Sequence, residues 1–307
     1  MSGWTLDDLS DQTGRTALVT GATGGLGHHV ALELARRGAR VVLAARSQDK
    51  LDTTTAQLQE AVPQAEFRQL LVDLADLSDV RRAATVAADL GPLHVLVNNA
   101  GVMATPEQRT VDGLDLQMAT NHFGHFLLTG LLLPQLVASG TGRVVNVSSN
   151  AHRMARSAPL GDPRLPEGHY SRWGVYGQSK LANLLFTYEL ERRLTAEDLP
   201  VHAMAAHPGY SATNLLATGQ TGRSGGGRAS ILNAAMRATA QPAHRGALPI
   251  LMAATANLPG GTYCGPGGLN QWRGQPQIVT SNALSHDEAA QEQLWQISER
   301  VTGLRYP

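Results

Sequence analysis

Cysteine, charge and aromatic side chains are all scarce in this chain of 307 residues. Cys264 is the single cysteine, so the chain can form neither an internal disulfide nor a zinc site with several cysteine ligands. Charged residues make up 16% of the chain, below the ~25% typical of soluble domains, and 25 Lys and Arg balance 25 Asp and Glu. Because the chain has no excess of basic residues, we expect it to bind neither nucleic acid nor an anionic membrane surface.

Long apolar runs and a basic N-terminal segment are also missing. The longest apolar stretch, 126–137, is interrupted by Thr129, Gly130, Pro134 and Gln135 and is shorter than the ~20 residues of a membrane span. Residues 1–8 are acidic and lack the pattern of a signal peptide. We therefore expect no membrane span, no export and a cytoplasmic location. We expect Cys264 to be a small buried side chain.

Alternating strand and helix patterns are what the chain does contain. Hydrophobic residues account for 42% of it, and short apolar runs predict strands at 16–20, 40–45, 66–72, 93–97, 143–147 and 201–205, with helical periodicity after them. Strands interleaved with helices imply a parallel sheet. With no repeat and no linker, the pattern predicts an α/β, doubly wound fold as a single domain over 1–307.

Two segments break this periodicity, and one helix-like run follows the core. The Pro-, Gly-, Arg- and His-rich stretch 151–174 precedes a helix expected at 178–194 and is predicted to be an inserted loop. The stretch 209–230 holds five glycines beyond Gly209 and is our candidate for a lid over a ligand. The run 287–301 places Leu294, Ile297 and Val301 on one face. It either packs on the core or forms a dimer contact, which leaves monomer and homodimer equally open.

A glycine-rich turn joins the first expected strand to the first helix. Gly21, Gly25 and Gly27 allow a tight turn and a close approach to a pyrophosphate, whose charge the helix N-terminus favours. Dinucleotide folds place an acid about 20 residues further on to bind the ribose 2′-hydroxyl; here Arg46, 19 residues after Gly27, ends the second strand. A guanidinium suits a 2′-phosphate, so we predict NADP(H) over NAD(H). The alternatives are a plain glycine turn and a solvated surface arginine.

From these motifs the chain resembles the short-chain dehydrogenase/reductase family over 14–265, with 266–307 as a C-terminal extension. Gly21, Gly25 and Gly27 match its TGxxxGxG turn, 98–101 its NNAG segment, and 176–180 its YxxxK motif. The resemblance implies a Rossmann fold with inserted substrate loops and a catalytic set of Asn121, Ser149, Tyr176 and Lys180. It also implies cofactor contacts from Gly21, Gly25, Leu26, Gly27, Arg46, Asp73, Leu74, Asn99, Ala100, Gly101, Tyr176, Lys180, Pro208, Gly209 and Thr213.

The chemistry of the YxxxK pair follows from its spacing. Tyr176 and Lys180 are four residues apart and share one helix face. A free tyrosine has a pKa near 10, so acid–base work at neutral pH requires a pKa lower by roughly 3, which Lys180 and a positive nicotinamide ring would provide. In reduction, Tyr176 is expected to protonate the developing alkoxide while Ser149 donates a hydrogen bond to the same oxygen. The resemblance further implies that Lys180 binds the nicotinamide ribose and that Asn121 holds a water linked to Lys180.

Three segments, 121–126, 179–183 and 207–209, are similar to the retinol-dehydrogenase-like branch of the family, as is the 27-residue spacing from Ser149 to Tyr176. This similarity implies hydride transfer between NADP(H) and a lipophilic carbonyl or alcohol, a small-molecule substrate. The alternatives are an NAD-dependent alcohol dehydrogenase of the same fold, a dinucleotide-sensing protein and an inactive scaffold. His122, His125 and His152 have no convergent metal-ligand spacing, so we expect no metal and assign them structural or solvent-facing roles, with His207 positioning the turn at Pro208.

Overall fold

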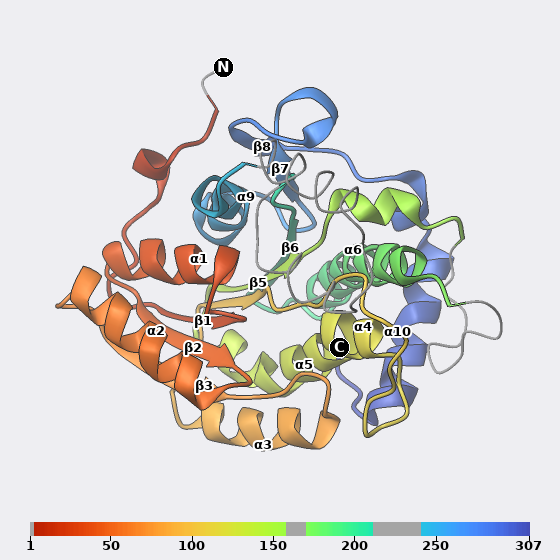
Figure 1. Cartoon of the computed structure of the whole chain (residues 1–307), viewed down its shortest axis with the longest axis horizontal. Helices are drawn as coiled ribbons and strands as arrows, with labels where there is room; N and C mark the ends of the chain where they lie inside the picture. The colour runs from red at the N-terminus through yellow and green to blue at the C-terminus, as the bar shows by residue number, and fades with distance from the viewer. Residues whose placement is uncertain (1–2, 158–169, 211–240) are drawn as a thin grey trace, which may run out of the picture.

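A single mixed sheet of eight strands organises the chain (Figure 1). The computed structural model describes residues 3–157, 170–210 and 241–307. The strands lie in the order β3-β2-β1-β4-β5-β6-β7-β8, all parallel except β8, which runs antiparallel to β7. They are β1 (Thr16–Thr20), β2 (Arg40–Ala45), β3 (Phe67–Leu71), β4 (Val95–Asn98), β5 (Gly142–Val147), β6 (Val201–Ala206), β7 (Tyr263–Pro266) and β8 (Pro276–Ile278). The predicted α/β, doubly wound, single-domain fold is confirmed.

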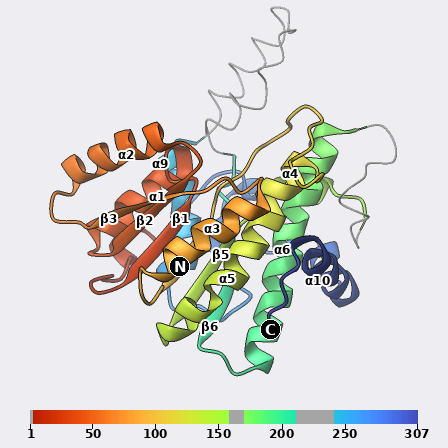
Figure 2. The ribbon, with the colours of Figure 1, turned by 90° about the horizontal axis from the view of Figure 1, so that it is seen from below.

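Helices cover both faces of the sheet. The principal ones are α1 (Gly25–Arg36), α2 (Gln48–Ala61), α3 (Leu77–Ala88), α5 (Gly124–Ala138), α6 (Arg172–Ala196), α9 (Ala243–Thr255) and α10 (Glu288–Thr302), with the short α4 (Leu116–Met118) before α5. Because side chains alternate along a strand, Leu18 of β1 packs with α3, α5 and α6, whereas Val19 packs with α1 and α9. Figure 2 shows α3, α5 and α6 together on one side of the sheet and α1 with α9 on the other.

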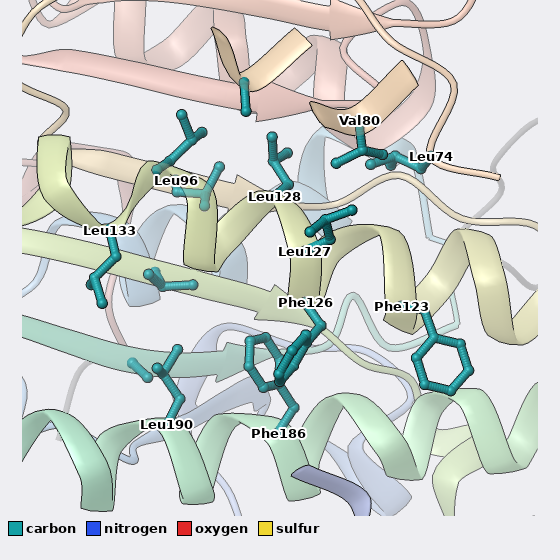
Figure 3. Close-up of a cluster of buried hydrophobic side chains, with 14 of the residues drawn as sticks. Leu74, Val80, Leu96, Phe123, Phe126, Leu127, Leu128, Leu133, Phe186 and Leu190 are labelled. Carbon is teal, nitrogen blue, oxygen red and sulfur yellow. The ribbon is translucent and has the colours of Figure 1, made fainter. Parts of the chain in front are cut away.

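The largest buried hydrophobic cluster of the described residues lies between the sheet, α5 and α6. Phe126 of α5 and Phe186 of α6 meet at its centre with ring centroids 5.4 Å apart (Figure 3). Trp295 of α10 packs on the same rings, with its centroid 5.0 Å from that of Phe126. The run predicted at 287–301 is therefore α10, and of the two roles left open for it, packing on the core is the one observed.

The inserted loop ends earlier in the chain than the sequence predicts. It was expected to run to Gly174, but α6 begins at Arg172, because Ser171 caps the helix by accepting a hydrogen bond from the Gly174 amide at 3.2 Å. At its start, residues Asn150–Met154 form the 3-10 helix η3. Most of the candidate lid, 211–230, lies outside the described residues. Among the helices that are described, none has the length and apolar character needed to cross a membrane.

Candidate active site

The predicted cofactor residues converge at the carboxyl edge of the sheet, where parallel α/β folds bind ligands. A hollow of about 260 Å³ opens over the ends of β1, β2, β3 and β4. Nine of the predicted residues line it: Gly21, Gly25, Leu26, Arg46, Asp73, Leu74, Asn99, Ala100 and Gly101. The strands bring together predicted residues that lie up to 80 positions apart in the chain.

The glycine turn has the shape that a diphosphate requires. Gly21 has a φ of +67°, and a Cβ added at Gly27 would overlap the Gly21 carbonyl oxygen and lie 2.6 Å from Asn99 Nδ2. Helix α1 begins after Gly24 without a side-chain cap or an acidic residue in its first turn, so its first amides are left for an anionic ligand. The turn therefore fits the pyrophosphate of a dinucleotide.

Gly27→Ala is expected to weaken NADPH binding at least about tenfold, because the neighbouring atoms are backbone and a buttressed amide that cannot move aside. Titration of the nucleotide by fluorescence would measure the loss. Gly14→Ala is the control, since Gly14 has a φ of +77° in a turn before β1 with nothing within 4 Å of the added Cβ; it should lower stability and leave affinity unchanged. Unaltered affinity in Gly27→Ala would contradict this view of the turn.

Two further polar side chains border the hollow beside Arg46. Ser47 and Lys50 also line it, and Lys50 lies one turn into α2, four residues after Arg46. Lys50 was not among the predicted residues, because its place beside Arg46 depends on the direction in which α2 leaves the end of β2. Both cations are exposed, so the hollow has a positively charged rim at the end of β2.

Tyr176, Lys180 and Ser149 meet where β5 ends and α6 begins. Lys180 Nζ lies 5.8 Å from the centroid of the Tyr176 ring and donates to the Val147 carbonyl at 3.0 Å. Ser149 follows β5 and caps η3, where its hydroxyl oxygen accepts from the Ala151 amide at 3.2 Å and keeps its own proton for another acceptor. Ser148 donates to the Lys180 carbonyl at 2.7 Å.

Burial determines the protonation of this group in the protein without a bound dinucleotide. Burial raises the pKa of Tyr176 to about 12, and its interaction with the Ser149 side chain lowers it only in part. Burial also lowers the pKa of Lys180 to about 8. At neutral pH Tyr176 is therefore a phenol that holds its proton.

Asn121 lies in η2 (Ala119–Phe123), a π-helical turn between α4 and α5. Its amide accepts from the Val102 amide at 2.8 Å and donates to the Val102 carbonyl and to Ser179 Oγ, both at 2.9 Å. A Cβ added at Gly101 would lie 3.0 Å from Asn121 Oδ1 and 3.6 Å from Lys180 Nζ. Gly101 thus adjoins both the dinucleotide hollow and the group around Lys180, and the two form one continuous site.

Some predicted cofactor residues do not border the hollow. Gly27 supports the turn from behind, and Thr213 lies outside the described residues. Pro208 and Gly209 follow β6, where the Gly209 amide donates to His207 Nδ1 at 3.2 Å and the Pro208 carbonyl accepts from Gln241 at 2.6 Å. His207 positions this turn as expected, and its Nε2 contacts Gln271 Oε1 at 3.1 Å.

The site histidines are structural rather than solvent-facing. Burial lowers the pKa of His122 and His207 to about 3 and that of His125 and His152 to about 4. Unfolded histidine titrates near 6.5, so between these values the unfolded chain binds protons that the folded chain does not. The stability they contribute is complete above pH 6.5 and is lost as the pH falls toward 4.

We expect the melting temperature to fall steeply between pH 7 and pH 5, because each of these histidines lowers the free energy of unfolding by about 2 kcal/mol by pH 5. His122→Gln should flatten this slope. The measurement is thermal unfolding by circular dichroism across the pH range. A melting temperature that is constant from pH 7 to pH 5 would contradict the assignment.

The fold and this site define the class of protein as a nicotinamide-dinucleotide oxidoreductase, and comparison with known proteins agrees. The sequence matches the short chain dehydrogenase family over residues 15–161. Polyprenol dehydrogenase of Danio rerio is 35% identical over 309 residues, which cover 98% of this chain and 90% of that protein. A crystal structure of an uncharacterized protein from Mycobacterium paratuberculosis is 42% identical, with a TM-score of 0.82 and full coverage of both chains.

Human retinol dehydrogenase 13 is 41% identical over 203 residues, 66% of this chain. The match spans 60% of that protein's own length, and 63% for the human retinol dehydrogenases 11 and 12. The chain belongs to the short-chain dehydrogenase family and is retinol-dehydrogenase-like, as its motifs indicated.

Proposed function

We propose that the protein transfers a hydride between NADP(H) and a lipophilic carbonyl or alcohol, with Asn121, Ser149, Tyr176 and Lys180 as its catalytic residues. The observation that carries the proposal is the continuity of the site: Gly101 adjoins both the dinucleotide hollow and the Lys180 ammonium. A cofactor along the hollow would therefore end beside Tyr176 and Ser149. We further propose a cytoplasmic protein, as monomer or homodimer, in keeping with a single buried cysteine.

The dinucleotide supplies the hydride when it is bound. The protein contributes the rest of the reduction. The Ser149 hydroxyl donates to the carbonyl oxygen of the substrate and so stabilises the charge that develops on it. Tyr176, which holds its proton because burial raises its pKa to about 12, donates that proton to the same oxygen. The Lys180 ammonium, 5.8 Å from the phenol ring, stabilises the phenolate that remains.

Arg46, Ser47 and Lys50 support a preference for NADP(H). They border the hollow at the end of β2, where a dinucleotide presents its adenosine ribose. A 2′-phosphate there would receive charge-assisted hydrogen bonds from two cations, whereas the 2′-hydroxyl of NAD(H) would not.

Exposed apolar side chains beside Tyr176 support a lipophilic substrate. The ring centroid of Trp173 lies 6.0 Å from that of Tyr176, and Trp173 is 44% exposed. Met154, which is 50% exposed, packs beside Gly177 on the adjoining turn of α6. Large exposed apolar side chains at a site are typical of binding surfaces for apolar ligands. The retinol and polyprenol dehydrogenases among the relatives are named for lipophilic alcohols.

The test is the absorbance at 340 nm of NADPH, then of NADH, in the presence of a panel of ketones, aldehydes and quinones that ranges from short polar to long apolar compounds. We expect oxidation of NADPH, faster with the longer apolar carbonyls. Faster turnover of NADH would establish the alternative, an NAD-dependent alcohol dehydrogenase. Tight NADPH binding without turnover of any compound would favour a dinucleotide sensor.

A further inference from the structure

A buried histidine that the proposed chemistry does not use bridges the two halves of the site. His125, in the first turn of α5, is 2% exposed. Its Nε2 lies 2.9 Å from Thr20 Oγ1, at the end of β1, and its Nδ1 lies 3.2 Å from the carbonyl oxygen of Asn121. The imidazole therefore contacts the glycine-turn strand with one nitrogen and the π-helical turn η2 with the other.

The partners of Thr20 determine which nitrogen of His125 carries the proton. Thr20 Oγ1 accepts hydrogen bonds from the Asn99 and Ala100 amides, both at 2.9 Å, which occupies its two lone pairs. Its one proton then goes to His125 Nε2, because the other available acceptor, the Val97 carbonyl, is more distant at 3.3 Å. Nε2 is thus an acceptor, and Nδ1 carries the proton and donates it to the Asn121 carbonyl, which can only accept.

Each end of this bridge leads to a different part of the site. Asn99 and Ala100 line the dinucleotide hollow, and their amides are held by the hydroxyl that His125 orients. Asn121 holds Val102 and Ser179 through its side chain, and Ser179 precedes Lys180 on α6. A displaced Asn121 would therefore shift the residues around the ammonium.

We propose that His125 is a positioning residue with two separable effects: through Thr20 it holds the Asn99–Ala100 segment for the dinucleotide, and through the Asn121 carbonyl it holds the group around Lys180 for turnover. This inference rests on the proposed hydride-transfer function. The imidazole remains neutral, since burial lowers its pKa to about 4, so it places no second positive charge near Lys180.

Two conservative variants separate the effects. In His125→Asn the amide nitrogen takes the place of Nδ1, which keeps the donor to Asn121 and loses the link to Thr20. In His125→Gln the longer side chain places its amide oxygen near the position of Nε2, which keeps the acceptor for Thr20 and loses the link to Asn121. We expect His125→Asn to weaken NADPH binding about tenfold with kcat within about threefold of wild type, and His125→Gln to show the reverse.

His122→Gln is the matched control. His122 is the neighbouring buried histidine, and its Nε2 lies 2.8 Å from Ser298 Oγ on α10, away from the dinucleotide hollow. The variant His122→Gln should lower the melting temperature, and it should not affect the affinity for NADPH and kcat to different extents. Equal losses of both quantities in His125→Asn and His125→Gln, or no loss in either, would overturn the proposal.

The affinity measurement needs no substrate, so it tests the Thr20 link even if the proposed function fails. Failure of that function would appear as wild-type protein that turns over no carbonyl. The order of NADPH dissociation constants, with His125→Asn weaker than His125→Gln, would still be expected. The opposite order, or equal values, would overturn the inference in that case too.

Discussion

Tyr176→Phe is expected to bind NADPH as tightly as the wild type and to reduce carbonyls at least about 10³-fold more slowly. The phenol is buried, and burial raises its pKa to about 12, so at neutral pH it carries the proton that the developing alkoxide needs. Phenylalanine preserves the ring and its edge-to-face contact with Trp173 but has no proton to give. Single-turnover measurements of NADPH oxidation, with the dissociation constant determined in parallel, would test this.

Two further variants define the specificity of that result. Ser149→Ala should lower kcat by about 10² because the carbonyl loses a hydrogen bond that strengthens as charge develops. Trp173→Leu keeps an apolar side chain beside Tyr176 and should retain kcat within about threefold, with a change mainly in KM for long apolar substrates. Near-normal turnover by Tyr176→Phe would contradict the role assigned to the phenol.

Replacing both rim cations, in the double variant Arg46→Gln and Lys50→Gln, is expected to raise the dissociation constant of NADPH by about 10² or more, because each charge-assisted hydrogen bond contributes about 1.5–3 kcal/mol. The dissociation constant of NADH should change by less than about threefold, since NADH has no 2′-phosphate. Isothermal titration with both nucleotides would measure the difference.

Arg68→Gln is the charge-matched control, because Arg68 is an exposed cation on β3 that pairs with Glu66 at 3.0 Å and does not line the hollow. It should leave both dissociation constants unchanged. If the double variant loses affinity for NADPH and NADH equally, the cations do not select the 2′-phosphate and the predicted preference is wrong.

The sequence predicted the fold well where apolar periodicity is long and regular. The expected strands at 16–20 and 40–45 coincide with β1 and β2, since each has a continuous apolar centre and turn residues follow it. It did not predict β7 (Tyr263–Pro266) or β8 (Pro276–Ile278), which have four and three residues and contain proline and glycine. These short strands form because β7 pairs with the edge of β6 and β8 then pairs with β7, and a local pattern does not show those edges.

At the site, motifs predicted which residues come together but not how they are bonded. The place of Lys50 at the rim depends on the direction of α2, and the bridge made by His125 depends on contacts between positions 105 residues apart. The burial of Tyr176, which raises its pKa to about 12, is likewise not visible in the spacing of Tyr176 and Lys180. Desolvation and tertiary hydrogen bonds are the terms that a sequence motif omits.

The most direct test of the central claim is to follow the transferred hydrogen. NADPH carrying deuterium at C4 of the nicotinamide would be incubated with a reactive apolar carbonyl, and the alcohol product would be analysed by mass spectrometry. We predict one deuterium at the carbinol carbon with the wild type and no product above background with Tyr176→Phe. Two results would contradict a tyrosine-dependent hydride transfer at this site. The first is an alcohol that carries no deuterium, whichever face of C4 is labelled. The second is as much deuterated alcohol from Tyr176→Phe as from the wild type.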